Sequence, residues 1–438
     1  MATVAYFLAC GLLAFLPNFA FFLVTTLILV WLISRGGMAN EPYELKLPFY
    51  IAVATKSILV VGLMFWNPFP PNYFYDSAHY AKLGRYLYEV ILMGGFSTEI
   101  ATSFATTSRD HLVYGGIFLL FGAITQDFEV KGPLLAQSLN LVSFSLGVFL
   151  LAKVVAFYGS LRIALYFGIA LAFIPSYAFW AGQNVRESIA FLGISGVLFA
   201  LMHGATPISQ RIGLFALMGV ILYFYRTQGS WVFFGGIGVY ILIQGLNLVS
   251  PKIRLVLWGG LVLLGWALLP FDHLPNLIQM ARDRSQAAYL NFGEIASMLE
   301  PGIALSTWPD LLSNGPLLWV KSQFYPLFFV YESNGKLGLI LSQIENTGLL
   351  LATISMVGYA VYSKKSVLLL PFLVYFAFSL VYSMVEPDLG SAGRHRMHYW
   401  PLLFLAFSSL FIAKGATNLK PGFFGRRVGI LFKLQGVA

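Results

Sequence analysis

Apolar runs of about 20 residues recur along the whole chain, and this repetition restricts the fold more than any other feature of the sequence. A run of about this length is what an α-helix needs to cross the hydrocarbon core of a bilayer. We count eleven, separated by shorter polar or turn-forming segments. They cover residues 4–33, 48–66, 133–153, 161–181, 188–204, 211–226, 229–248, 253–270, 336–362, 366–385 and 397–414.

Composition indicates the same fold class. Hydrophobic residues make up 58% of the 438 residues and charged residues only 10%, and the mean hydropathy is +0.77. Soluble domains are roughly 45–50% apolar and about 25% charged, and a soluble protein of this length cannot bury so much apolar surface. The sequence therefore predicts an all-α polytopic membrane protein, with about 11 transmembrane helices and further juxtamembrane or interfacial helices in its outside loops.

Basic residues predict the orientation of the spans, because cytoplasmic loops carry an excess of lysine and arginine. The tail after residue 414 is basic, so we expect it in the cytoplasm, and alternate loops then contain basic residues as well. The net charge of +9 is thus mainly an orientation signal, and no nucleic-acid partner is predicted. The residues concerned are Lys414, Lys420, Arg426, Arg427 and Lys433 in the tail, and Lys364, Lys365, Lys252, Arg254, Arg211, Lys153, Arg162, Arg35 and Lys46 in the loops.

The other loops are predicted to face the outside; they are 67–132, 182–187, 226–228, 271–335 and 386–396. The short apolar run 111–125 is expected to lie against the outer leaflet as a half-helix. The first long run has no signal-peptide features, so we expect it to be retained. It contains Pro17 and forms either one helix or two short ones. We divide the chain into an N-terminal membrane segment with its cytoplasmic loop (1–47), a transmembrane bundle (48–414) and a cytoplasmic tail (415–438).

Four arginines lie in or beside the predicted outside loops, where the positive-inside rule disfavours them. Arginines that converge at the mouth of a helix bundle are suited to bidentate binding of a phosphate. Alternatively, some of them pair with Glu187 or Asp388, or extend to lipid headgroups. The four are Arg186 in GQNVRES, Arg226 in YFYRTQGS, and Arg394 and Arg396 in SAGRHRMHYW.

No motif of a soluble enzyme competes with this interpretation. The sequence contains no P-loop, no His-Glu-x-x-His and no Gly-x-Ser-x-Gly. Cys10 is the only cysteine, which excludes an intrachain disulfide and a thiolate metal site. The six histidines show no metal-ligand spacing, and we expect His395 and His398, which flank arginine, in a solvated loop.

Several segments resemble, in order, elements of one family. YDSAHYAKLGRYL resembles the first-loop Asp-x-x-x-Tyr pattern of the polyprenol-dependent membrane glycosyltransferases of the GT-C superfamily. RDHLVYGGIFLLFG is similar to their juxtamembrane helix, and FIPSYAFWAGQNVRESIAFLGISG to the segment before their next span. GRHRMHYWPLLFLA resembles the Gly-Arg-(aromatic)-Arg…Pro element before a late helix. The matching pieces cover most of residues 67–410.

This resemblance implies inverting transfer of a sugar from a polyprenyl-phosphate donor to a hydroxyl of a glycan, lipid or protein, on the outer side of the cytoplasmic (inner) membrane. Asp76 would be the general base, unless it is an ordinary loop carboxylate or helix N-cap. Arg186, Arg226, Arg394 and Arg396 would hold the donor phosphate. Further candidates for substrate binding are Tyr80, Glu187, Lys321, Glu345 and His398.

The sequence departs from the family pattern at two positions, and Glu345 is a separate candidate. Many members of the family have a second acid after the first-loop aspartate, but here that position is Ser77. One carboxylate is a poor site for a divalent cation, so no metal or other cofactor is expected to be obligatory. His111 precedes leucine where the family has His-Pro, and we assign it no role. Glu345 lies inside an apolar span, where a carboxylate is costly, and it either contacts substrate or pairs with an arginine.

Two other functions remain open. An O-antigen-type polymerase or ligase would use lipid-diphosphate oligosaccharides, and the long loop 271–335 with its sequence ARDRSQ is compatible with that class. A lipid or glycan transporter would need no catalytic base. Transporters often show internal repeats or helices broken at matching positions, and the sequence shows neither.

Overall fold

The computed structural model of the chain is all-α, which confirms that part of the predicted fold class. It describes residues 2–66, 75–91, 93–95, 97–107, 109–174, 177, 186–246, 273–291, 302–325, 340, 343–351, 353–355, 369–386, 395–396, 398–403 and 405. The chain divides into two compact units, unit 1 (Met1–Ser230) and unit 2 (Trp231–Ala438). The predicted tail 415–438 lies outside the described residues.

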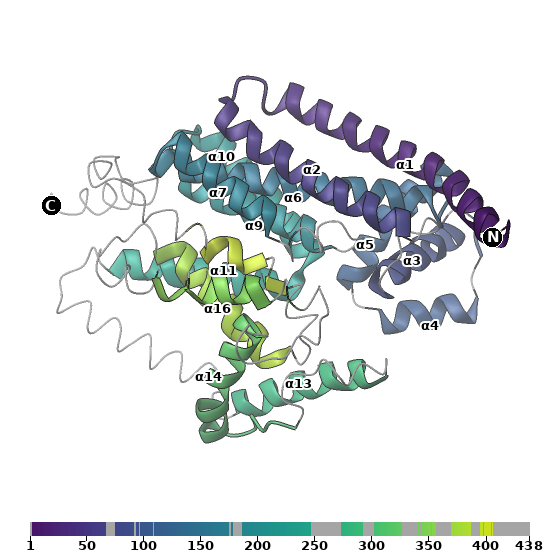
Figure 1. Cartoon of the computed structure of the whole chain (residues 1–438). Helices are drawn as coiled ribbons and strands as arrows, with labels where there is room; N and C mark the ends of the chain where they lie inside the picture. The colour runs from purple at the N-terminus through teal and green to yellow at the C-terminus, as the bar shows by residue number, and fades with distance from the viewer. Residues whose placement is uncertain are drawn as a thin grey trace. The chain divides into compact units, whose positions relative to one another are not determined.

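Unit 1 contains most of the described long apolar helices (Figure 1). The central one is α6, which packs against α1, α2, α5, α7 and α9. Its Ser138 Oγ accepts a hydrogen bond of 3.0 Å from Thr26 Oγ1 of α1, a kind of polar contact that joins helices in apolar surroundings. The long apolar helices are α1 (Ala2–Gly36), α2 (Tyr43–Trp66), α6 (Lys131–Tyr158) and α10 (Ile208–Tyr225), and two shorter apolar helices, α7 (Leu161–Phe173) and α9 (Glu187–Met202), pack among them.

The first apolar run forms one helix, so the alternative of two short helices is wrong. Helix α1 continues through Pro17, and apolar helices tolerate proline because neighbouring groups and local adjustments satisfy the freed carbonyl. Large apolar side chains of α1 stay exposed, with Val24 at 53%, Leu27 at 55% and Trp31 at 57%. A contiguous apolar surface of this kind is suited to lipid rather than to water.

Four described helices are long and apolar enough to cross a membrane, judged by length and composition. The expected total of about 11 spans stays a prediction, because 253–270 and parts of 336–362 and 397–414 lie outside the described residues. Helix α7 is shorter than the predicted run 161–181, since it ends at Phe173. Pro175 explains this end, because a proline disfavours helical backbone at the residue before it. The four spans are Leu16–Gly36, Tyr43–Gly62, Lys131–Tyr158 and Ile208–Tyr225.

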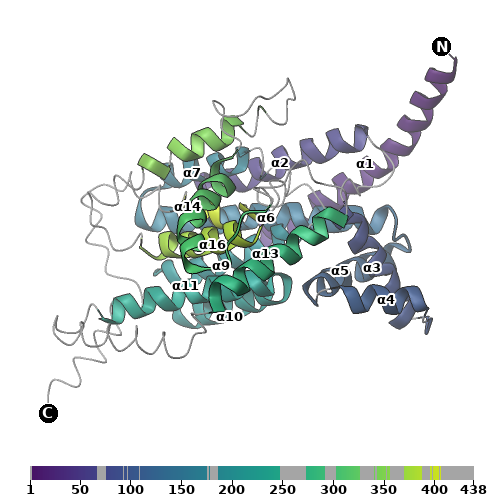
Figure 2. The same ribbon diagram turned by 90° about the horizontal axis from the view of Figure 1, so that it is seen from below.

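The predicted outside loop 67–132 contains three helices, α3 (Tyr75–Ile91), α4 (Thr98–Thr106) and α5 (Arg109–Thr125). Helices α3 and α5 lie side by side in both views (Figures 1 and 2). Their backbones approach closely at Gly84, where a Cβ atom would lie 2.5 Å from Phe118 Cβ and 2.8 Å from the backbone nitrogen of Leu119. Glycine is therefore required there for the crossing to form.

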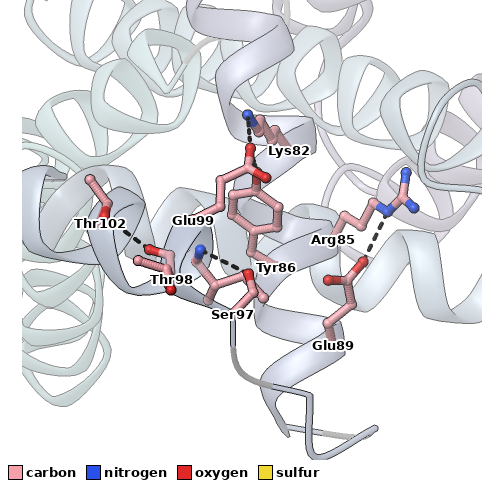
Figure 3. Close-up of polar contacts among 9 residues, drawn as sticks. Lys82, Arg85, Tyr86, Glu89, Ser97, Thr98, Glu99 and Thr102 are labelled. Carbon is pink, nitrogen blue, oxygen red and sulfur yellow. Dashed lines mark hydrogen bonds and ion pairs between the residues drawn. The ribbon is translucent and has the colours of Figure 1, made fainter.

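Polar contacts attach α4 to α3 (Figure 3). Glu99 Oε1 accepts hydrogen bonds from Lys82 Nζ at 2.8 Å and from Tyr86 Oη at 2.5 Å. These two bonds, that of Lys82 first, lower the pKa of the Glu99 carboxyl, and the bond to Glu99 is the main cause that raises the pKa of Lys82. Ser97 caps α4, because its Oγ accepts from the backbone nitrogen of Ile100 at 3.3 Å.

Unit 2 contains α13 (Leu274–Asn291), α14 (Trp308–Phe324) and α16 (Leu369–Val385), together with most of α11 (Thr227–Leu246). Both α13 and α14 fall in the predicted outside loop 271–335, which was expected to contain helices, and both pack against α16. Trp319 Nε1 of α14 donates to Ser379 Oγ of α16 at 2.9 Å.

Candidate functional site

A buried polar cluster joins five helices of unit 1, and we refer to its members Tyr80, Tyr114, Asn140, Glu187 and Arg226 as the unit 1 cluster. Glu187 begins α9 and is 1% exposed, and Arg226 follows α10 and is 7% exposed. Arg226 Nη1 lies 3.8 Å from Glu187 Oε1. This ion pair confirms the alternative that one of the four predicted arginines pairs with Glu187.

Aromatic contacts connect this ion pair to α3. The Tyr80 ring packs edge-on against the Tyr114 ring, with 4.6 Å between centroids. Tyr114 Oη accepts a hydrogen bond of 2.5 Å from Asn140 Nδ2, and its ring lies 6.1 Å from that of Tyr225, the residue before Arg226. One connected cluster therefore contains three of the residues predicted from the sequence, Tyr80, Glu187 and Arg226.

Asp76, the predicted general base, belongs to the same helix as Tyr80. Helix α3 begins at Tyr75, so Asp76 lies within its first turn and neither in a loop nor at the N-cap position. The side chain of Asp76 lies outside the described residues. Arg186, the second of the predicted arginines, directly precedes Glu187 in the sequence. It is also buried, with 7% of its surface exposed.

Opposite ends of the unit 1 helices differ in their polar chemistry. The unit 1 cluster lies where α9 begins and α10 ends. At the other ends, Lys153 Nζ bonds Glu41 Oε1, and Arg211 Nε donates to the backbone oxygen of Ala200 at 2.6 Å. The basic loops predict that Lys153 and Arg211 lie inside and that Glu187 and Arg226 lie outside; this orientation stays a prediction.

Arg396 of unit 2 is held by acceptors of the protein itself. Its guanidinium donates to Ser322 O at 2.8 Å, to Asn346 Oδ1 at 2.8 Å and to Tyr325 O at 3.1 Å. It also lies over the Trp400 ring, 5.0 Å from the centroid. A role of Arg396 in binding phosphate stays a prediction, and so does that of Arg394, which lies outside the described residues.

His395 and His398 are buried, so the expectation of a solvated loop is wrong. Their exposed fractions are 5% and 0%. Glu386, which follows α16, places its Oε2 3.0 Å from His395 Nδ1, and the Tyr382 ring lies 4.7 Å from the His395 ring. The carboxylate of Glu386 gives His395 a polar partner inside the protein. The arginines beside His395 in the sequence do not indicate this partner.

The two remaining candidates belong to unit 2. Lys321 lies in the last turn of α14 and is partly exposed. Glu345 is partly buried within helical residues 343–351, next to Asn346, which accepts the bond from Arg396. Substrate contact by Lys321, Glu345 and His398 stays a prediction.

Three buried residues were not among the site residues predicted from the sequence: Tyr114, Asn140 and Lys56. Asn140 and Lys56 carried a usable signal, since each is a strongly polar residue inside a predicted span. Among the described residues, no group of three or more histidine, cysteine, aspartate or glutamate side chains is arranged to hold a metal ion.

Comparison of the chain with protein-family models, with curated proteins and with solved structures gave no match.

Proposed function

We propose that the protein is a multi-pass membrane glycosyltransferase that moves a sugar from a polyprenyl-phosphate donor to an acceptor hydroxyl on the extracytoplasmic side. The unit 1 cluster is the observation that carries the proposal. It buries an arginine, a carboxylate and two tyrosines at the helix ends assigned to the outside, on elements that include the helix of Asp76. Ionisable groups buried among apolar helices are costly and usually functional.

The proposed reaction is a single displacement with inversion. The Asp76 carboxylate takes the proton of the acceptor hydroxyl as the oxygen forms a bond to the anomeric carbon. The bond between that carbon and the phosphate oxygen breaks, and the polyprenyl phosphate leaves with the electron pair. Fixed positive charge stabilises the negative charge that develops on the leaving phosphate.

Arg226 and Arg186 are the arginines that we propose first for this role. Both are buried beside the start of α9, and Arg226 is oriented by Glu187. Arg394 stays a candidate from its position in the sequence. Arg396 already donates to three protein acceptors, which favours a role in holding α14 to the last described helical segment.

The substrate itself requires both apolar and polar surroundings. A polyprenyl chain is a lipid, and exposed apolar side chains on α1 and α10 are suited to a lipid environment. Tyr80 and Tyr114 offer aromatic rings and hydroxyls of the kind that bind sugars. We propose no obligatory cofactor or metal, and addition of a chelator is expected to leave the activity unchanged.

A lipid or glycan transporter is the second candidate, and the buried Glu386–His395 pair favours it. Carboxylate and histidine pairs inside apolar bundles occur in proton relays of pumps and transporters. The two functions are separable by experiment, because a transporter moves its substrate across the bilayer without forming a glycosidic bond.

The test is an assay of the purified chain in nanodiscs with a panel of polyprenyl-monophosphate and polyprenyl-diphosphate sugars, read by mass spectrometry of the acceptor fraction. The proposal predicts transfer from a monophosphate donor. It also predicts that Arg226→Gln weakens donor binding, whereas Arg85→Gln, on the exposed side of α3, does not. Transfer from diphosphate donors only would favour the polymerase or ligase, and flux across vesicles without transfer would favour the transporter.

A further inference from the structure

Lys56 is a fully buried cation inside the unit 1 bundle. It belongs to α2, its exposed fraction is 0%, and it is the kind of residue that is rarely buried without a partner. Among the described residues, no carboxylate forms an ion pair with it. The proposed transfer reaction does not use this lysine, so its burial requires another explanation.

The main partner of Lys56 is the carboxyl end of α7. Lys56 Nζ donates to the backbone oxygen of Ala172 at 3.0 Å. Ala172 lies in the last turn of α7, whose final four carbonyls have no acceptor role inside the helix. The carboxyl end of a helix also carries the negative end of the helix dipole, which attracts a cation.

The position of this helix end makes the contact important. Helix α7 has 13 residues and is therefore about 20 Å long, which is shorter than the roughly 30 Å of a bilayer core. Leu171 and Ala172 are both buried. Carbonyl groups buried among apolar helices in this way cannot bind bulk water, and each one left unsatisfied costs several kcal/mol in general.

The surroundings of the ammonium group form a defined site. Nζ lies 4.5 Å from the centroid of the Phe144 ring of α6, a cation–π contact. That ring is itself fixed, since it stacks on Phe191 of α9 with 4.9 Å between centroids. Thr55 Oγ1 lies 3.4 Å from the same Ala172 oxygen, but it is closer to the backbone oxygen of Ile51, at 2.9 Å, so Lys56 is the main donor to Ala172.

Close packing of α2 and α7 holds the two partners together. A Cβ atom at Gly168, one turn before Ala172, would lie 2.4 Å from Pro48 Cβ, so the two helices approach closely there. The end of α7 is thus held beside α2, with little freedom to move away from Lys56.

We propose that the carboxyl end of α7 is a cation-binding site that the ammonium group of Lys56 fills from within the chain. In broken helices of membrane transporters, free helix ends of this kind bind ions. Here the ligand class is a primary ammonium, recognised by the Ala172 carbonyl and the Phe144 ring. Removing the side chain at Lys56 therefore opens a site that a small alkylammonium ion can occupy.

The test compares thermal unfolding of the full chain in nanodiscs for the wild type, Lys56→Ala, Lys56→Gln and Lys56→Met, with and without n-propylammonium chloride. Potassium chloride at equal ionic strength is the control. We expect Tm to fall by about 4 °C or more in Lys56→Met, and by less in Lys56→Gln, whose amide still offers a donor. Propylammonium should raise the Tm of Lys56→Ala and leave the wild type and Lys56→Met unchanged.

Thr55→Val serves as the matched variant, because it keeps the bond from Lys56 to Ala172 and removes the long contact of Thr55 with Ala172, together with the bonds of Thr55 to Ile51 and Ala52 in its own helix; it should lower Tm less than Lys56→Met. Two results would overturn the proposal: a Lys56→Met protein as stable as the wild type, or a rise in Tm with propylammonium that is equal in all variants. If Lys56→Ala gives no folded protein, the Tm values of the other proteins test the proposal. They should then decrease in the order wild type, Lys56→Gln, Lys56→Met. The outcome is independent of sugar transfer.

Discussion

Glu187 and Arg226 form a buried ion pair in which Oε1 and Nη1 lie 3.8 Å apart, although 39 positions separate the two residues in the sequence. The pair connects the first residue of α9 to the residue after α10. It is the electrostatic centre of the proposed site, and it also joins two helices.

Breaking this pair should destabilise the protein strongly. Arg226→Met leaves the Glu187 carboxylate buried without its described partner, which costs about 3–5 kcal/mol for pairs of this kind. The free energy of unfolding in denaturant-titrated micelles measures the loss. The double variant Glu187→Gln/Arg226→Met should lose less than the sum of the single variants. Arg85→Gln is the control, because the exposed pair of Arg85 with Glu89 contributes less than about 1 kcal/mol. Equal losses of unfolding free energy in Arg226→Met and Arg85→Gln would contradict the prediction.

Gly84 should not tolerate a side chain. In Gly84→Ala the new Cβ would meet Phe118 Cβ at 2.5 Å, and forcing α3 away from α5 costs about 1–3 kcal/mol. Gly116→Ala, on α5, meets nothing within 4 Å and should be neutral or stabilising by about 0.5–1 kcal/mol. Urea or thermal unfolding of both variants measures the difference, and a stable Gly84→Ala would show that the two helices are not in close contact.

The stability of the wild type should fall as the pH drops from about 6.5 towards 4, in part because of His203. Burial, and next the positive charge of Lys153, lower the pKa of His203 to about 4. The unfolded chain therefore binds a proton in this range that the folded chain does not bind, which favours unfolding at lower pH. In His203→Gln this part of the pH dependence should be absent from Tm measured across the range. Parallel curves for the two proteins would reject the prediction.

The contact between α3 and α4 should also weaken in acid, because it depends on an ionised carboxylate. Because hydrogen bonds from Lys82 and Tyr86 lower the pKa of Glu99, its contribution is present above its unfolded pKa and is lost as the pH falls through the lowered value. The raised pKa of Lys82 maintains the contact on the alkaline side, up to its folded value. The Tm difference between wild type and Glu99→Gln should be small, constant near neutral pH and reduced by salt, since both groups are exposed. A difference that grows in acid would be inconsistent with this contact.

Much of the helical architecture follows from patterns that the sequence displays directly. Apolar runs locate α2, α6, α9 and α10 to within a few residues, and Pro175 explains why α7 ends early. The pairing of an outside arginine with Glu187 was among the predicted alternatives.

What could not be predicted depends on contacts between distant segments. Arg396 is an example, since its acceptors come from α14, from Tyr325 after that helix and from Asn346. Mean hydropathy over a span does not reveal Lys56, because a single charge hardly changes the average. The contact of Lys56 also depends on where α7 ends, which hydropathy does not predict.

The central claim is tested most directly by comparing wild type and Asp76→Asn for donor binding and for sugar transfer in the same nanodisc preparation. Asp127→Asn is the control from the same predicted outside loop, since the Asp127 carboxylate caps local backbone nitrogens and has no proposed role in transfer. The account predicts that Asp76→Asn binds the polyprenyl-phosphate sugar as the wild type does but transfers it about 100-fold more slowly or worse, whereas Asp127→Asn retains transfer. Full transfer by Asp76→Asn would contradict the assignment of Asp76 as the base.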